Sequence, residues 1–85
     1  MRIKVSPQFQ KNYKKLPNSI KEKAKKKETI FRNNPFDSQL KTHKLSGRHK
    51  DSWAFWVDYS YRIIFIFLSS EEILFLDIGS HKVYK

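Results

Sequence analysis

The sequence predicts an α+β fold in which a small antiparallel sheet packs against an N-terminal helical hairpin, with the element order β-α-α-β-β-β. Apolar residues recur at helical spacing between residues 7 and 33, and three strand-like runs follow between residues 52 and 78. Aromatic residues make up 15% of the 85 residues, which argues against disorder. A chain of this length fits one hydrophobic core, so we expect residues 1–85 to form a single domain.

The first strand and the first helix are predicted by local patterns. Residues 2–6 alternate polar and apolar side chains, which predicts a short strand with Ile3 and Val5 facing inward. Ser6 and Pro7 then mark a helix start, because serine caps helices and proline suits the first helical position. The stripe that follows consists of Phe9, Tyr13 and Leu16.

The second helix is predicted to begin near Ser19 and to end before Pro35. Ser19 and Glu22 have the spacing of a capping box, in which each side chain bonds the other's backbone N–H. The residue before a proline disfavours helix, so Asn34 should end it. The short break at Pro17 makes the two helices an antiparallel hairpin.

A loop is expected over residues 36–50, followed by three antiparallel strands. The runs at 52–57, 61–68 and 72–78 are rich in Trp, Phe, Ile and Tyr. Residues 58–60 and 69–71 separate them with good turn chemistry. The second half of the chain is therefore predicted to be a meander.

The charge is strongly positive and unevenly distributed. The net charge is +10, and the basic residues concentrate in residues 1–50. A basic half on a small domain is typical of proteins that bind nucleic acid. Unbalanced charge also favours an acidic protein partner.

Several classes of site are excluded by what the sequence lacks. There is no cysteine, and the three histidines are too widely spaced for a zinc cluster. There is no glycine-rich phosphate loop, signal-peptide pattern or run of about 20 apolar residues. We therefore expect a cytoplasmic protein that needs no metal or small-molecule cofactor and makes no membrane contact.

The residue types that remain suit metal-free cleavage of RNA. A base would remove the proton of a ribose 2′-hydroxyl, a cation would stabilise the phosphate, and an acid would protonate the leaving oxygen. The residues available for this chemistry are His43, His49, Arg62, His81 and Tyr84. Those expected to contact RNA are Lys41, Lys44, Arg48, His49, Lys50 and Trp56. Structural roles remain open at this point, since Arg62 could pair with Asp58 or Asp77 and Tyr84 could close the edge of the core.

Three stretches, taken in order, resemble the RelE/ParE superfamily of bacterial toxins, and within it the RelE and YafQ-like branch. They are HKLSG at 43–47, WAFWVDYSYRIIF at 53–65 and LDIGSHKVY at 76–84. The resemblance implies a RelE-like fold and ribosome-dependent cleavage of mRNA in the A site, by 2′-hydroxyl attack and without metal. It also implies a cognate antitoxin, which we expect to be acidic.

The resemblance also implies roles for individual residues. His43 would be a general base or acid, and Arg62 would hold the scissile phosphate. His81 would be a second proton-transfer group, and Tyr84 would stack on or position a base.

The sequence departs from the YafQ-like pattern in three respects. Trp56 and Ser60 stand where such toxins place a second histidine and an acid, and the spacing from His81 to Tyr84 is one residue short. Two alternatives therefore remain: a ParE-type toxin that binds DNA gyrase without catalysis, and a catalytically weak RelE-like nucleic-acid-binding protein.

Overall fold

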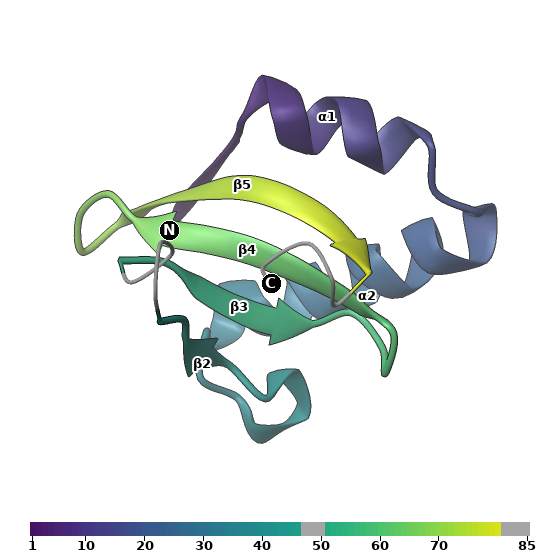
Figure 1. The fold of residues 1–85 in the computed structure, drawn as a ribbon. Helices are drawn as coiled ribbons and strands as arrows, with labels where there is room; N and C mark the ends of the chain where they lie inside the picture. The colour runs from purple at the N-terminus through teal and green to yellow at the C-terminus, as the bar shows by residue number, and fades with distance from the viewer. Residues whose placement is uncertain (47–50, 81–85) are drawn as a thin grey trace.

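Two α-helices and a five-stranded sheet make up the computed structural model of this chain, which describes residues 1–46 and 51–80 (Figure 1). The elements in chain order are β1 (Arg2–Val5), α1 (Pro7–Lys14), α2 (Asn18–Asn33), the short 3₁₀ helix η1 (Ser38–Leu40), β2 (His43–Lys44), β3 (Trp53–Trp56), β4 (Tyr61–Phe67) and β5 (Glu72–Ser80). The predicted α+β class is confirmed. No helix in the described ranges is long and apolar enough to cross a membrane.

The strands lie in the order β1-β5-β4-β3-β2. The predicted antiparallel meander of β3, β4 and β5 is confirmed, and β2 continues it at one edge. β1 occupies the other edge and runs parallel to β5, with Arg2 opposite Glu72, so the sheet is mixed. A parallel pair needs a long crossover, and here the connection includes both helices and three strands.

The main core lies between the helices and one face of the sheet, as the helical-hairpin prediction requires. Phe31 of α2 is fully buried, and its ring centroid lies 4.8 Å from that of Phe55, 5.0 Å from Phe65 and 5.5 Å from Phe75. Phe9 of α1 lies 5.5 Å from the same Phe75. Both helices therefore cover one face, with α1 along β5 and α2 behind the sheet in Figure 1.

The two helices begin differently. Ser6 caps α1 as predicted: its Oγ accepts a hydrogen bond from the Phe9 N–H at 3.0 Å and donates to the Leu76 carbonyl at 2.7 Å. The capping box predicted for α2 is wrong, because the helix begins at Asn18, two residues before the position that a cap at Ser19 would give. Pro17 is the capping residue there and has no side-chain hydrogen bond, so Ser19 lies inside the first turn.

Ile3 and Val5 face the helices, as predicted. Ile3 packs against the core and Val5 is paired with the core residue Phe75, but Val5 is 38% exposed. The reason is a cleft of about 430 Å³ beside the two helices, lined by Val5, Phe9, Tyr13, Ala24, Ile63 and Phe75 among others. The side chain faces this opening rather than a packed neighbour.

The segment predicted as a loop before the meander is partly ordered into η1 and β2. Asp37 caps η1, with its Oδ1 accepting from the Gln39 N–H at 2.9 Å. Lys41 then takes a left-handed conformation with φ 51°, and this turns the chain into β2. β2 pairs with β3 and carries His43 onto the sheet.

Candidate active site

Three of the residues expected to act on RNA lie on the face of the sheet that the helices leave open. His43 is paired with Ala54, and Trp56 is paired with Arg62. Directly paired residues share a face, and successive residues of a strand alternate between faces. Since Phe55 belongs to the core beneath the helices, the two neighbours of Phe55 in β3 and their partners His43 and Arg62 project to the opposite face.

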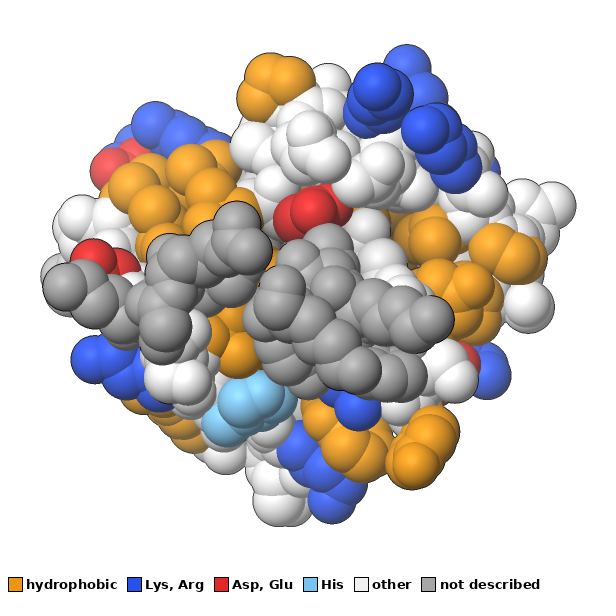
Figure 2. Space-filling model, in the orientation of Figure 1, with side chains coloured by type: hydrophobic (Ala, Val, Ile, Leu, Met, Phe, Trp, Pro, Cys, Tyr) orange, Lys and Arg blue, Asp and Glu red, His pale blue; other side chains and the backbone are white. Residues whose placement is uncertain are grey.

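Apolar and basic side chains are mixed on the described part of this open face. Because α2 lies behind the sheet in Figure 1, Figure 2 shows the opposite face, with Lys and Arg side chains next to hydrophobic ones and a histidine among them. Leu45, Ala54 and Ile64 form a small apolar cluster there, against which Leu76 packs. The open face therefore has a small hydrophobic cluster of its own next to its polar side chains.

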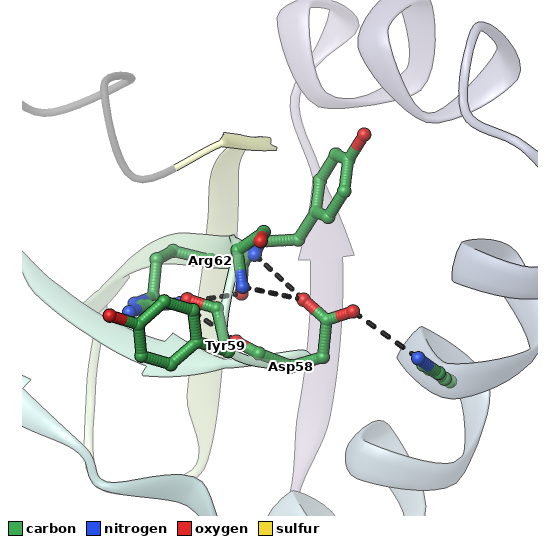
Figure 3. A network of polar contacts seen from close by, with 6 residues as sticks. Asp58, Tyr59 and Arg62 are labelled. Carbon is green, nitrogen blue, oxygen red and sulfur yellow. Dashed lines mark hydrogen bonds and ion pairs between the residues drawn. The ribbon is translucent and has the colours of Figure 1, made fainter.

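Arg62 is buried and holds the turn between β3 and β4. It is only 6% exposed, and its Nη1 donates to the carbonyl oxygens of Asp58 at 2.7 Å, Tyr59 at 2.7 Å and Tyr61 at 3.2 Å (Figure 3). Its Nε has no hydrogen-bond partner among the residues that the structure describes. The guanidinium carbon also lies 4.2 Å from the centroid of the Trp56 ring. The partners of Arg62 are thus backbone carbonyls and an aromatic ring, not the carboxylates of Asp58 or Asp77.

Asp58 holds the same turn from the other side. Its Oδ1 accepts from the backbone N–H of Ser60 at 2.8 Å and of Tyr61 at 2.9 Å, and its Oδ2 lies 3.3 Å from Lys23 Nζ on α2. Burial raises the pKa of Asp58, but the hydrogen bonds from Tyr61, Ser60 and Lys23 outweigh this and leave it below its ordinary value of 3.8. The Asp58 carboxylate therefore holds the turn as an anion.

Trp56 lies at the centre of an aromatic and cationic group. The Lys41 Nζ lies 5.3 Å from the centroid of its ring, in addition to the Arg62 contact. The Tyr59 ring meets it at 5.9 Å and 85°, an edge-to-face contact. Sequence reasoning treated Tyr59 only as part of a turn. The available signal was a large aromatic side chain at a position where turns prefer small polar residues.

A hydrogen bond to the backbone favours one tautomer of the neutral His43 ring. Its Nδ1 lies 3.0 Å from the Lys41 carbonyl oxygen, which can only accept a hydrogen bond. The proton of the neutral ring is therefore assigned to Nδ1, and the lone pair to Nε2. A neutral imidazole in this tautomer is a base at Nε2.

The remaining predicted residues are either on another face or not described. Lys44 is paired with Trp53, so it projects to the opposite face from His43. Arg48, His49, Lys50, His81 and Tyr84 lie outside the described residues. β5 ends at Ser80, which is paired with Tyr61, immediately beside the Arg62–Gly79 pair. No group of three His, Asp or Glu side chains in residues 1–46 and 51–80 could hold a metal ion.

Comparison with known proteins gives a consistent result. The sequence model of the family described as "Bacterial toxin of type II toxin-antitoxin system, YafQ" matches residues 1–84. A crystal structure of YafQ from E. coli strain BL21(DE3) is 26% identical, covers 96% of each chain and has a TM-score of 0.79. YafQ in the E. coli DinJ-YafQ toxin-antitoxin complex is 26% identical, with 94% of this chain and 91% of that chain covered and a TM-score of 0.75. The archaeal RelE-RelB complex from Pyrococcus horikoshii OT3, at 20% identity, 96% coverage of each chain and a TM-score of 0.74, shares the fold. No curated protein sequence matches.

Proposed function

Because this chain belongs to the YafQ family of toxins from type II toxin–antitoxin systems, we propose that it is an endoribonuclease that cleaves mRNA in the ribosomal A site without metal. The observation that carries the proposal is the shared open face of His43, Trp56 and Arg62. A base, an aromatic ring and buried positive charge lie on neighbouring strands there, and Lys41 adds an exposed cation. Residues 1–85 act as one domain in this proposal.

The reaction follows from the groups available. His43 Nε2 takes the proton of the ribose 2′-hydroxyl, and the 2′-oxygen attacks the adjacent phosphorus. The bond from phosphorus to the 5′-oxygen breaks, leaving a 2′,3′-cyclic phosphate on one fragment. An acid must give the departing 5′-oxygen its proton, and His81 is our candidate for it. The cations beside Trp56 favour the added negative charge on the phosphate, and Tyr84 is our candidate for positioning the base.

The proposal includes two partners besides mRNA. The ribosome supplies the substrate, which places the toxin in the cytoplasm. The second partner is a cognate antitoxin, supported by the complex of E. coli YafQ with DinJ. A toxin with a net charge of +10 would be matched by an acidic antitoxin, which we expect to order on binding.

Induced expression with mapping of transcript ends tests the proposal. Wild-type toxin should arrest growth and produce cuts within translated codons, and His43→Gln should lower the cleavage rate by about 10²–10⁴-fold, the usual range for one general base. Arg32→Ala, which changes an exposed arginine of α2 on the far side of the sheet (Figure 1), is the control and should cleave normally. Growth arrest with intact mRNA and DNA damage would instead indicate a gyrase-directed toxin. Normal growth with RNA binding retained would indicate a catalytically weak protein.

A further inference from the structure

The side chain of Tyr59 is exposed in a way that packing does not explain. It is 79% exposed, more than any other large hydrophobic side chain reported for the described residues, where Phe36 follows at 54%. An aromatic ring left in water at a turn contributes little to the core. Among the residues that the structure describes, its ring contacts one other aromatic ring, that of Trp56, edge to face. At this exposure, most of the ring surface is accessible to a planar ligand.

The backbone beneath Tyr59 is unusually well fixed for an exposed turn. The Arg62 Nη1 donates to the carbonyl oxygens of Asp58 and Tyr59. Asp58 Oδ1 accepts from the backbone N–H groups of Ser60 and Tyr61. Lys23 ties Asp58 to α2 (Figure 3). An aromatic side chain held on a rigid turn loses little conformational freedom when a ligand binds, and this favours affinity.

The surroundings of Tyr59 favour RNA as the ligand. Single-stranded nucleic acid is bound by combining aromatic rings, on which bases stack, with cations that attract phosphates. Tyr59 and Trp56 supply two rings, and Arg62 and Lys41 supply two cations within 5.3 Å of the Trp56 centroid. His43 projects from the same face. A base on Tyr59 would therefore belong to a strand that crosses the proposed catalytic face.

We propose that Tyr59 is a base-stacking residue for single-stranded RNA, presented on the turn that Arg62 and Asp58 fix. The substrate class rests on the proposed function. The stacked base would be next to the nucleotide being cleaved or near it, so that Tyr59 contributes to the position and preference of the cut.

Binding and cleavage measured separately test this inference. The binding probe is a fluorescent 2′-O-methyl oligoribonucleotide, which lacks the attacking hydroxyl and so stays intact. Tyr59→Ala should weaken its binding by about 5- to 150-fold, the range expected for loss of one base–aromatic stack. Tyr59→Phe should bind like wild type, and Tyr59→Leu, which keeps apolar bulk without a π face, should resemble the alanine variant. In cleavage on ribosomes, Tyr59→Ala should raise KM more than it lowers kcat.

Phe36→Ala is the matched control, because it removes an exposed ring that packs on Trp53 and Phe67 rather than on Trp56. Equal RNA affinity of wild type and Tyr59→Ala, or an equal loss in Phe36→Ala, would overturn the inference. So would a Tyr59→Ala variant that loses antitoxin affinity alone. A wild type that binds RNA through Tyr59 but never cleaves mRNA would overturn the proposed function and leave the inference standing. A wild type that neither binds nor cleaves would overturn both.

Discussion

Replacing Arg62 with alanine should destabilise the fold by about 3 kcal/mol. The change removes two charge-assisted hydrogen bonds at 2.7 Å, each worth about 1.5–3 kcal/mol. It also removes the contact with the Trp56 ring, worth about 1–2 kcal/mol at a buried site. In return, the variant recovers about 1–3 kcal/mol, because the unpaired Nε is no longer buried. The middle of each range gives a net loss in unfolding free energy of about 4 kcal/mol. Water that reaches the turn carbonyls in the variant reduces this loss to about 3 kcal/mol.

Urea unfolding monitored by tryptophan fluorescence measures this loss. With an m-value of about 1 kcal/mol per M for a small protein, the midpoint should fall by about 3 M. The urea midpoint of Arg62→Lys should lie between those of wild type and Arg62→Ala, since an ammonium group can replace some of the hydrogen bonds to the carbonyls but not the planar stacking on Trp56. Arg32→Ala is the control: Arg32 is an exposed arginine paired with Glu28 at 3.3 Å, and its loss should cost about 0.3–0.5 kcal/mol.

A small effect would refute the reasoning. If Arg62→Ala lost no more stability than Arg32→Ala, the guanidinium would not be committed to the turn in solution. It would then be able to bind a phosphate directly, as the family resemblance implies, and not only to favour its charge from a buried position. A large stability loss together with intact RNA affinity would assign Arg62 to the turn alone.

Two further predictions concern the cap of α1 and the turn between β3 and β4. Ser6→Ala should lower the free energy of unfolding by about 1–2 kcal/mol in thermal or urea melts, because it removes the hydrogen bond from the Phe9 N–H and the hydrogen bond to the Leu76 carbonyl. Ser6→Thr keeps the hydroxyl and should restore most of this stability. Asp58→Asn should be less stable than wild type at pH 7, and the gap should close as the pH falls. The pKa of Asp58 is lowered in the folded state, so its contribution is present above the ordinary value of 3.8 and is lost as the pH falls through the folded value. A gap that stayed constant from pH 7 to pH 2 would contradict this assignment.

Much of the fold could be predicted because its elements follow local rules. Helical spacing and the Ser6 cap located α1, and the aromatic runs located the meander within one or two residues at each end. The pairing of β1 with β5 could not be predicted, since no local pattern records which distant strand lies alongside. β2 was missed because a strand of two residues is too short to show an alternation of polar and apolar side chains. Only its pairing with β3 makes it a strand.

The candidate site was predictable by residue type but not by arrangement. His43 and Arg62 were identified as suitable for RNA chemistry, yet their common face depends on the register of β2, β3 and β4. The bonds of Arg62 to three carbonyls depend on the path of the turn, which the sequence leaves open. An aromatic residue in a turn was the available signal for Tyr59, but its contact with Trp56 and the hydrogen bonds from Arg62 to its turn are defined only by the folded chain.

The parallel pairing of β1 with β5 has a consequence for biosynthesis. β1 pairs with β5, which follows it by some 70 residues, and the Ser6 side chain bonds the carbonyl of Leu76, 70 positions later. A nascent chain that has not yet exposed β5 has no partner for β1, only one neighbour for β4, and no Phe75 for the two helices to pack on. Such distant contacts also slow folding, since a long loop must close before they form. The toxin fold therefore closes only after β5 has been made, and a nascent chain without β5 lacks Gly79 as the neighbour of Arg62.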